Sequence, residues 1–494
     1  MATAEDKLFE RARLSRDVRF DGRFFVAVKT TGIYCRPVCP AKPPKAENVR
    51  FYRTAAAASE AGFRPCLRCR PETAPGSPAW VGSSTTVRRA LRLIAHGALD
   101  EGNVPQLADR LGVTSRHLRR LFDQHIGASP LAVAQTQRLH FAKRLVDDTS
   151  LSMTDVALAA GFGSVRRFND TFRRAYGRSP RSLRTSKRDK KVGEGATLTV
   201  RIPVREPYSW DSALAFFRAR AIPGVEAVVD GHYRRSVRFG DGSESPHGAI
   251  DISAAATPGQ LEVRLIAAQA NDVFAASQRV RDLLDADAPV HDITTVLGQD
   301  AALKSRLKAL PGPRVMGAWD GFELLVRAIL GQQVSVAAAT TLSGRVASRY
   351  GERLDPAIAR AAPGLEYVFP TADKLSRARM NNMGIVGSRI QSIRALAREV
   401  AQGNLQLDAS ASPDDVYAAM TAIRGIGDWT AQYVLMRVVR VPDAFPASDL
   451  GLLKALEPGQ RLTAKALAER SERWRPWRAY AAALLWYATP NSGG

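Results

Sequence analysis

Cysteine is scarce in this chain, and long apolar runs are absent. Its 494 residues include four cysteines, all within the first 69 positions. We do not expect a disulfide framework, because disulfides are rare in cytosolic proteins. No stretch approaches the roughly 18 consecutive apolar residues that a membrane-spanning helix needs. Residues 1–6 lack the basic-then-apolar layout of a secretory signal. We therefore expect a soluble, cytoplasmic protein without a membrane partner.

Acidic residues are also in short supply. Lys and Arg number 71 against 48 Asp and Glu, which gives a net charge of +23. Residues 1–78 contribute +7 and residues 79–192 contribute +12, so most of the excess lies in the first 192 residues. Such concentration is typical of a phosphate-binding surface. A basic surface that serves only solubility would not need its charges concentrated in one part of the chain.

The length predicts three or four domains at about 150 residues each. Three breaks mark boundaries: a Pro/Gly/Ser-rich segment at Pro71–Pro78, a charged hinge at Ser186–Gly195, and Pro311–Pro313. After the hinge, residues 196–204 alternate apolar and polar side chains like a strand, whereas the last segment is mainly helical. The predicted domains span residues 1–78, 79–192, 196–310 and 311–494.

The cysteines form two short pairs. Their spacing is C-x3-C at Cys35 and Cys39, then C-x2-C at Cys66 and Cys69. Two such pairs can converge on one tetrahedral zinc, because soft thiolate ligands suit that metal. The spacing alone leaves a purely structural zinc site and a chemically active one equally open.

The second domain contains an internal repeat. Gly127-Ala128-Ser129-Pro130 recurs as Gly177-Arg178-Ser179-Pro180, and each copy predicts a helix, a tight turn and a second amphipathic helix. The predicted apolar faces comprise Leu107, Ala108, Leu111, Leu118, Leu121 and Phe122, and then Val156, Ala157, Ala160, Phe162, Phe168, Phe172 and Tyr176. The predicted exposed basic residues are Arg116, Arg119 and Arg120, and then Arg166, Arg167, Arg173 and Arg174.

Two helix-turn-helix units would place these basic helices in successive major grooves of DNA. The alternative is a plain helical bundle with a solvated basic face, but the doubled turn and the local charge favour DNA. The segment Asp155–Ser164 resembles the second unit of the AraC-type DNA-binding domain, and the resemblance covers about residues 85–185.

The cysteine region has a resemblance of its own. The segments Thr30–Cys39 and Ala61–Cys69 resemble the N-terminal domain of the Ada family of DNA-repair and regulatory proteins over about residues 5–75. This resemblance implies that Cys35 is both a zinc ligand and the acceptor of a methyl group from a DNA methylphosphotriester, with Cys39, Cys66 and Cys69 as the other ligands. It also implies phosphate contacts by Thr31, Lys42 and Arg64. Lys42 stands where the family has arginine, so the charge is kept and the bidentate fork is lost.

The implied chemistry is physically reasonable. Zinc keeps a thiol deprotonated at neutral pH, and the thiolate is the nucleophile. Four thiolates outweigh the charge of one Zn²⁺, so the site repels DNA phosphate until methylation removes one negative charge. The transfer is stoichiometric, and methylation is expected to strengthen DNA binding. Full-length Ada continues into a second, cysteine-dependent methyltransferase domain, whose activity we do not expect because no cysteine follows Cys69.

The C-terminal half carries little net charge and no cysteine, so its chemistry must use other groups. Asp449 lies in the largely apolar stretch Phe445–Leu453, where a helix N-cap is the simplest interpretation of a lone Asp. Upstream, Gly425-Ile426-Gly427 predicts a tight turn entering a helix, whose backbone amides can bind a phosphate.

Together these features resemble the helix-hairpin-helix DNA glycosylases. The resemblance extends through Trp319–Glu323, Arg327–Val336, Trp474–Arg478 and Pro207–Trp210 to the AlkA-type 3-methyladenine DNA glycosylase II. It implies a catalytic Asp449, a flipped-base pocket, DNA contacts at Gly425 and Gly427, and no cofactor for this half. The implied pocket residues are Phe216, Trp429, Tyr433 and Trp486.

Three positions bear on specificity and mechanism. Gln333 occupies the position whose side chain fills the gap left by the flipped base, where the family usually has an aliphatic residue. Leu450 replaces an aromatic residue after the catalytic Asp. Trp429 stands where bifunctional members carry a Schiff-base lysine, so we expect a monofunctional hydrolase.

The sequence therefore predicts a multidomain α+β protein: a small four-cysteine zinc domain, an all-α double helix-turn-helix domain, a mixed α/β subdomain with an antiparallel sheet, and an all-α helix-hairpin-helix core. The expected function is repair of alkylated double-stranded DNA, joined to sequence-specific DNA binding at promoter sites. The alternative is a transcriptional regulator with a weak or inactive glycosylase half. We expect one zinc per chain, a monomer, and association with the bacterial nucleoid.

Overall fold

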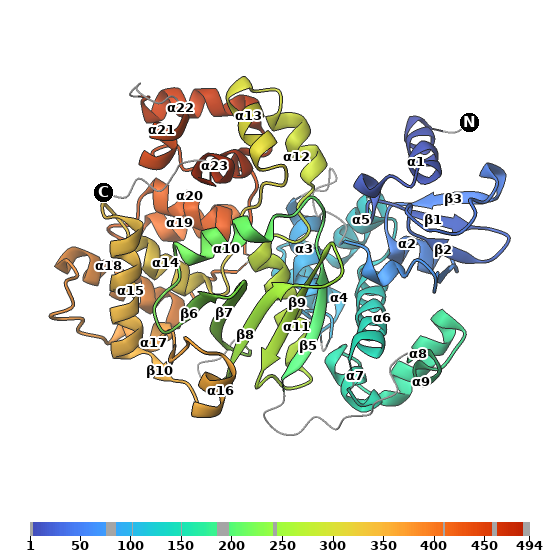
Figure 1. Ribbon diagram of the computed structural model, residues 1–494, viewed down its shortest axis with the longest axis horizontal. Coiled ribbons are helices and arrows are strands. Elements are labelled where there is room, and N and C mark those ends of the chain that lie inside the picture. Colours follow the sequence, from blue (N-terminus) through green and yellow to red (C-terminus); the bar gives the residue numbers. More distant parts are fainter. Residues whose placement is uncertain are drawn as a thin grey trace. The chain divides into compact units, whose positions relative to one another are not determined.

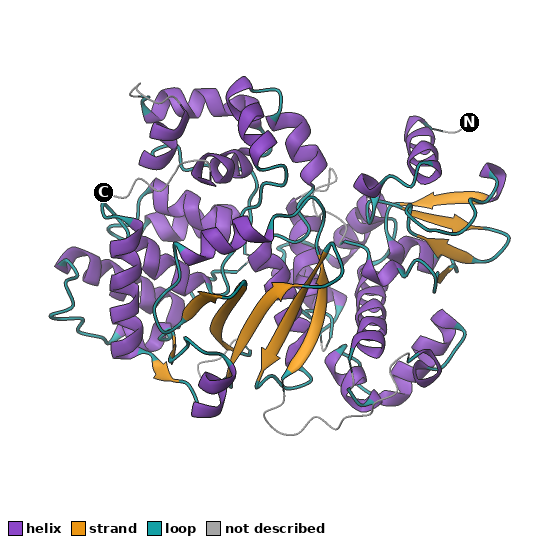
Figure 2. Ribbon diagram, in the orientation of Figure 1, coloured by secondary structure: helices purple, strands orange, loops and turns teal. Residues whose placement is uncertain are grey.

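The computed structural model describes residues 3–75, 85–100, 102–149, 151–184, 197–240, 245–408, 411–456 and 462–487. It forms two compact units (Figures 1 and 2). Unit 1 comprises residues 1–204 and 269–278, and unit 2 comprises residues 205–268 and 279–494. Residues 76–78 and 186–195 of the predicted linkers lie outside the described residues. In the part of the chain that is described, no helix has the length and apolarity to cross a membrane.

The first part of unit 1 is a small sheet with helices around it. Its elements are α1 (Ala4–Leu14), η1 (Val18–Phe20), β1 (Phe25–Val28), β2 (Ile33–Cys35), η2 (Ala46–Asn48), β3 (Val49–Tyr52), α2 (Ala55–Glu60), β4 (Arg64–Pro65) and η3 (Pro71–Thr73). The strand order is β3-β1-β2-β4, with β2 and β4 parallel. Phe9 stacks on Phe24 with ring centroids 4.2 Å apart, and this core supports the sheet. Because parallel strands end at the same edge, Cys35 and Cys66 are brought together there.

The rest of unit 1 is helical apart from one strand. Its elements are α3 (Thr85–Ala95), α4 (Val104–Arg110), α5 (Ser115–Ile126), α6 (Pro130–Asp148), α7 (Met153–Ala159), α8 (Val165–Tyr176), α9 (Pro180–Leu183) and β5 (Leu198–Pro203). Helices α4 and α5 form one helix-turn-helix and α7 and α8 the other. Gly112 and Gly161 have φ of +70° and +73° at the two turns, where glycine has no steric penalty.

The predicted repeat is confirmed by this part of the structure. Each second helix ends at a left-handed glycine, Gly127 or Gly177. Each is followed by a serine N-cap with proline at the first helical position. The predicted apolar residues are buried, except that Leu121 is partly buried.

Within unit 1, helix α6 of the helix-turn-helix domain packs against the N-terminal cysteine domain. The Tyr34 hydroxyl lies 2.8 Å from Nε2 of His140, and burial lowers the pKa of His140 to about 3. The His140 ring is therefore neutral near pH 7 and acts as a hydrogen-bonding partner. At the start of α6, Glu60 accepts hydrogen bonds from the backbone and the hydroxyl of Ser129.

Unit 2 contains an antiparallel sheet and many helices. The sheet strands are β6 (Glu226–Val229), β7 (His232–Arg238), β8 (His247–Ala254) and β9 (Gln260–Ile266), in the order β9-β8-β7-β6. The first helices are α10 (Trp210–Arg218), α12 (Val290–Leu297), α13 (Ala301–Ala309), α14 (Gly321–Leu330) and α15 (Val336–Tyr350). Helix α11 (Asp272–Leu284) begins in unit 1 and belongs to unit 2 from residue 279 onward. A short pair, β10 (Glu352–Arg353) and β11 (Tyr367–Val368), follows.

The remaining helices complete the core around the hairpin. They are α16 (Pro356–Ala361), α17 (Ala372–Ser376), α18 (Gly387–Ala401), α19 (Pro413–Thr421), α20 (Asp428–Arg437), α21 (Leu450–Leu456), α22 (Ala464–Ser471), η4 (Glu472–Trp474) and α23 (Arg478–Tyr487). The α19–turn–α20 segment is the predicted helical hairpin. The predicted fold class is confirmed in all its parts.

Candidate functional site

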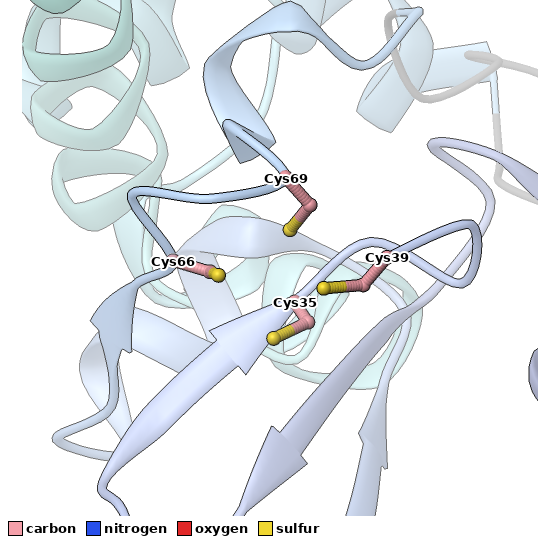
Figure 3. Close-up of side chains that lie close together, drawn as sticks. All are labelled: Cys35, Cys39, Cys66 and Cys69. Carbon is pink, nitrogen blue, oxygen red and sulfur yellow. The ribbon is translucent and has the colours of Figure 1, made fainter. Parts of the chain in front are cut away.

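The four cysteine sulfurs converge on one point in unit 1 (Figure 3). All four Sγ atoms lie within 4.8 Å of one another. Cys35 ends β2 and Cys66 follows β4, while Cys39 and Cys69 come from the loops after them. The predicted convergence of the two cysteine pairs is therefore confirmed.

The donor set fits a metal ion. Hydrogen bonds with Cys39, Cys66 and Cys69 raise the pKa of the Cys35 thiol, so these sulfurs cannot all ionise without a cation among them. Four sulfur ligands at this spacing suit a tetrahedral, thiolate-preferring metal such as zinc. Cys66 and Cys69 are buried, whereas Cys35 and Cys39 are partly accessible.

Arg36 fixes the loop between the first two cysteines. Its backbone N–H donates to Sγ of Cys69 at 3.3 Å, and its guanidinium pairs with Asp21 and donates to Thr73 at 2.8 Å. These contacts hold the sulfurs in place from outside the cluster, as groups around a metal's ligands commonly do.

The predicted phosphate-contacting residues of this domain all lie on its surface. Thr31, Lys42 and Arg64 are exposed. Thr31 follows β1 in the turn before β2, and Arg64 is the first residue of β4. A Cβ placed on Gly177 would lie 3.0 Å from Nη1 of Arg64, so this arginine reaches the end of α8. The three residues are therefore accessible to a ligand.

The second helices of both helix-turn-helix units present basic side chains to solvent. The exposed arginines are Arg116, Arg119 and Arg120 on α5 and Arg166, Arg167, Arg173 and Arg174 on α8. The opposite sides of these helices bury Leu118 and Phe122 in α5 and Phe168 and Phe172 in α8. Their exposure agrees with the predicted helical faces.

In unit 2, Asp449 accepts hydrogen bonds from two indoles. Nε1 of Trp429 lies 2.8 Å from Oδ2, and Nε1 of Trp486 lies 3.0 Å from Oδ1. The backbone N–H of Leu452 also donates to Oδ1 at 2.9 Å. Asp449 is thus a helix N-cap, as the sequence by itself favours, and is also the centre of a specific polar arrangement. A helix N-cap needs only the hydrogen bond from the backbone N–H of Leu452.

The aromatic side chains predicted to form a pocket do not all contact one another. Trp429 stacks on Tyr433 with centroids 5.3 Å apart, and Tyr433 meets Trp486 edge to face at 6.0 Å. Phe216 contacts Tyr487 at 5.7 Å. It is linked to Tyr433 through Arg437, whose guanidinium lies 5.0 Å from the Phe216 ring and 5.3 Å from the Tyr433 ring.

The hairpin turn has a glycine that no other residue can replace without strain. Gly425 has φ of +89°, and a Cβ there would lie 2.3 Å from Oγ of Ser392. Gly427 is the N-cap of α20, and a Cβ there would meet no described atom within 4 Å. A side chain at position 427 would therefore enter open space.

A loop beside this turn carries Gln333. Gln332 donates to the carbonyl of Gly425 at 2.9 Å, which fixes the loop against the hairpin. Gln333 is exposed and has φ of +55°, a conformation that non-glycine residues rarely adopt. The next residues, Val334 and Val336, are exposed hydrophobics. Leu450, the residue after Asp449, is 70% exposed.

Two arginines that contact these aromatic rings were not predicted from the sequence. Arg220 lies 4.2 Å from the Phe216 ring centroid, and Arg437 contacts Tyr433. Both arginines follow their aromatic partner by four residues, a helical spacing that puts two side chains on one face. This spacing is the feature of the sequence from which the two contacts could have been predicted.

Family models match most of the chain. Residues 9–72 match the metal binding domain of Ada, and residues 107–186 match a helix-turn-helix domain. Residues 199–320 match the AlkA N-terminal domain, and residues 326–478 match the HhH-GPD superfamily base excision DNA repair protein.

Known proteins are similar to this chain over the same regions. The chain is 42% identical over 480 residues to the "Probable bifunctional transcriptional activator/DNA repair enzyme AlkA" of Mycobacterium tuberculosis, covering 96% of this chain and 95% of that protein. It is 35% identical over 288 residues to the "DNA-3-methyladenine glycosylase 2" of Escherichia coli, covering 57% of this chain and 94% of that protein. The "3-methyladenine dna-glycosylase from Archaeoglobus fulgidus" has a similar fold over 58% of this chain and 96% of that one, with a TM-score of 0.50 and 22% identity.

Proposed function

The chain belongs to the family of bifunctional transcriptional activator/DNA repair enzymes of the AlkA type, and from this premise we propose that it excises alkylated purines through Asp449 and accepts methyl groups from DNA phosphotriesters at Cys35. The observation that supports excision best is the hydrogen bonding of Asp449 by Trp429 and Trp486 at 2.8 and 3.0 Å. A helix N-cap by itself requires neither indole contact.

Excision breaks the bond between C1′ of the sugar and the purine nitrogen, and its electron pair leaves with the base. Positive charge develops on the sugar, and the Asp449 carboxylate stabilises it. The same carboxylate orients the water that forms the new C1′–O bond and accepts the proton that this water loses. The two indole N–H groups hold both carboxylate oxygens in position. Trp429 cannot form an imine, so the expected product is an intact abasic strand.

The test of this half is base release by the full chain from a duplex that carries 3-methyladenine. Asp449→Asn should lower the rate by at least roughly 10²-fold, the scale of lost electrostatic and acid–base assistance, while DNA binding is largely kept. Asp373→Asn removes an exposed carboxylate from α17 and is the matched control. An Asp449→Asn protein that excises at the wild-type rate, or robust borohydride trapping of the wild type, would refute the assignment.

For methyl transfer, Cys35, Cys39, Cys66 and Cys69 would hold one zinc ion, which keeps the sulfurs as thiolates when it is bound. Sγ of Cys35 attacks the methyl carbon, the S–C bond forms as the C–O bond breaks, and the electron pair stays on the phosphate oxygen. Support for Cys35 over Cys66 and Cys69 comes from its accessibility, because the latter two are buried.

The test of this half is mass spectrometry of the full chain after incubation with methylated DNA. One methyl group should be found, on Cys35, and Cys35→Ala should abolish uptake and weaken zinc binding together. A methyl group on Cys66 or Cys69 would overturn the residue assignment. The absence of any uptake would leave the cysteine site with a structural role.

The surface residues complete the proposal. Thr31, Lys42 and Arg64 would contact the phosphates around the lesion. Arg116, Arg166 and Arg167 would enter successive major grooves of a promoter site. In unit 2, Gly425 and Gly427 would bring the amides of the hairpin to a phosphate, and Gln333 would fill the gap left by the flipped base.

A further inference from the structure

The loop that carries Gln333, residues 331–335, is fastened to the helical hairpin by its neighbour in the sequence. We call this segment the wedge loop. It follows α14, which packs against both α18 and α20 (Figure 1). The side-chain amide of Gln332 donates to the carbonyl of Gly425 at 2.9 Å and to Oγ1 of Thr430 at 3.4 Å. One side chain therefore connects the wedge loop to the hairpin turn and to the helix that follows it.

Helix α18 binds the same two segments. Arg389, in its first turn, donates to the carbonyl of Gln332 and, at 3.5 Å, to the carbonyl of Leu330. Ser392, one turn later, donates to the carbonyl of Arg424 at 2.8 Å. Side chains therefore bind backbone carbonyls on both the wedge loop and the hairpin turn, and the two segments form one assembly.

The backbone of Gln333 shows what this assembly enforces. Its φ of +55° is a left-handed conformation that costs free energy for a residue other than glycine. Such a conformation persists only where the surrounding contacts determine it. The preceding residue, Gln332, is bound at its carbonyl by Arg389 and through its side chain to Gly425. These bonds therefore fix the direction in which the exposed residue 333 leaves the loop.

Base flipping gives a reason for this fastening. A glycosylase must keep the lesion out of the base stack while the C1′–N bond breaks, against the stacking and pairing energy that favours its return. A residue that fills the gap opposes this return only if its backbone stays in place relative to the DNA strand. The hairpin amides would bind a phosphate of the DNA, so fastening the wedge loop to the hairpin fixes Gln333 relative to the DNA.

We propose that Gln332 and Arg389 are positioning residues that fasten the wedge loop to the hairpin and thereby keep the lesion base flipped. This inference rests on the proposed glycosylase function and on the proposed role of Gln333. It assigns to the two side chains a role in the flipping equilibrium, whereas bond cleavage remains the task of Asp449.

Gln332→Met is the sharpest perturbation, because methionine keeps the length of the side chain, removes both hydrogen bonds and changes no charge. Arg389→Met and Arg389→Lys form a second pair. Lysine keeps the positive charge, which attracts phosphate, but loses the fork that binds two carbonyls, so both variants should be impaired. Gln402→Met changes an exposed glutamine at the other end of α18. It is the matched control and should behave like the wild type.

The assay is single-turnover excision of 7-methylguanine by the full chain at saturating protein, so that differences in DNA affinity do not enter the rate. The same lesion strand is annealed to two complements, one with cytosine opposite the lesion and one with an abasic-site analogue there. The unpaired lesion flips at a lower cost, so the wild type should excise it faster.

The expected losses differ between the two duplexes. With cytosine opposite the lesion, Gln332→Met should lower the rate about fivefold, the scale of one net hydrogen bond. Arg389→Met should lower it about tenfold, because hydrogen bonds from a charged group are stronger. Both losses should shrink to less than about twofold on the unpaired lesion, whose flipped state needs less support.

A loss confined to the paired lesion separates a positioning role from structural damage or weaker chemistry, which lower both rates alike. Equal losses on the two duplexes, no loss in Gln332→Met, or a wild type that excises the unpaired lesion no faster would overturn the inference and leave the proposed function intact. Arg389→Lys at the wild-type rate would overturn the role of Arg389, because charge alone would then suffice. A wild type that excises neither lesion would instead overturn the proposed function, and this inference with it.

Discussion

Removing the Lys143 ammonium should destabilise the junction between the cysteine domain and α6. The carboxylate of Glu72 is only 1% exposed and lies 3.8 Å from Nζ of Lys143, whose side chain is 6% exposed. Arg70 donates to the same oxygen of Glu72 at 3.2 Å. The other oxygen, Oε2, has no hydrogen-bond partner in the part of the chain that is described. Lys143 also pairs with Asp147 at 2.5 Å, and Asp147 keeps Arg70 when the lysine is lost.

Lys143→Met leaves a buried carboxylate with one remaining cation. Breaking a buried pair by removing one partner costs about 3–5 kcal/mol, and we expect about 3 kcal/mol here because Arg70 remains. Burial raises the pKa of Glu72, and Lys143 is the main charge that opposes the rise. A carboxyl with a raised folded-state pKa loses stability as pH rises above its unfolded value near 4.5. Without Lys143 the pKa rises further, so the loss should be larger at about pH 8 than at about pH 4, where the carboxyl is largely protonated in both the folded and the unfolded state.

Hydrogen exchange of the α6 amides in the zinc-loaded full chain measures this change locally. A loss of about 3 kcal/mol corresponds to roughly a hundredfold faster exchange at about pH 8. The control is the double variant Lys143→Met with Glu72→Gln, which removes both charges and should recover most of the protection. Unchanged exchange in Lys143→Met, or a double variant as unstable as the single one, would refute the reasoning.

Three further outcomes are expected. Gly425→Ala should destabilise unit 2 by more than about 1 kcal/mol, because alanine resists a positive φ and its Cβ would collide with Ser392. Thermal unfolding measures this loss, and the control variant Gly427→Ala should show no comparable one. Equal losses in the two variants would contradict the prediction. Chelation of the metal should unfold the cysteine domain, which is measured as lost hydrogen-exchange protection in β1 and β2. Base excision by unit 2 should persist. Loss of excision together with this protection would show that the two halves depend on one another. Methylation of Cys35 should tighten binding to promoter DNA, and the gain should shrink as salt rises; equal affinities at low salt would exclude an electrostatic switch.

Local features of this protein are determined by sequence alone. The cysteine spacing indicated a metal site, because short pairs bring sulfurs onto adjacent loops. The repeated Gly-x-Ser-Pro turns gave both helix-turn-helix units, because left-handed glycines, serine caps and apolar spacing act within a few residues of one another. The exposure of Arg166 and Arg167 followed from the same helical periodicity.

The tertiary structure decided what depends on side chains far apart in the chain. Asp449 looked like a simple helix cap, and only packing brought the indoles of Trp429 and Trp486, 20 and 37 residues away, onto its oxygens. The helical spacing of Arg220 and Arg437 could have suggested their aromatic partners. That Arg437 contacts both Phe216 and Tyr433 could not be foreseen, because these two rings come from helices far apart in the chain. The role of each of these charged side chains therefore depends on its burial and on the partners that packing brings to it, and not on residue type alone.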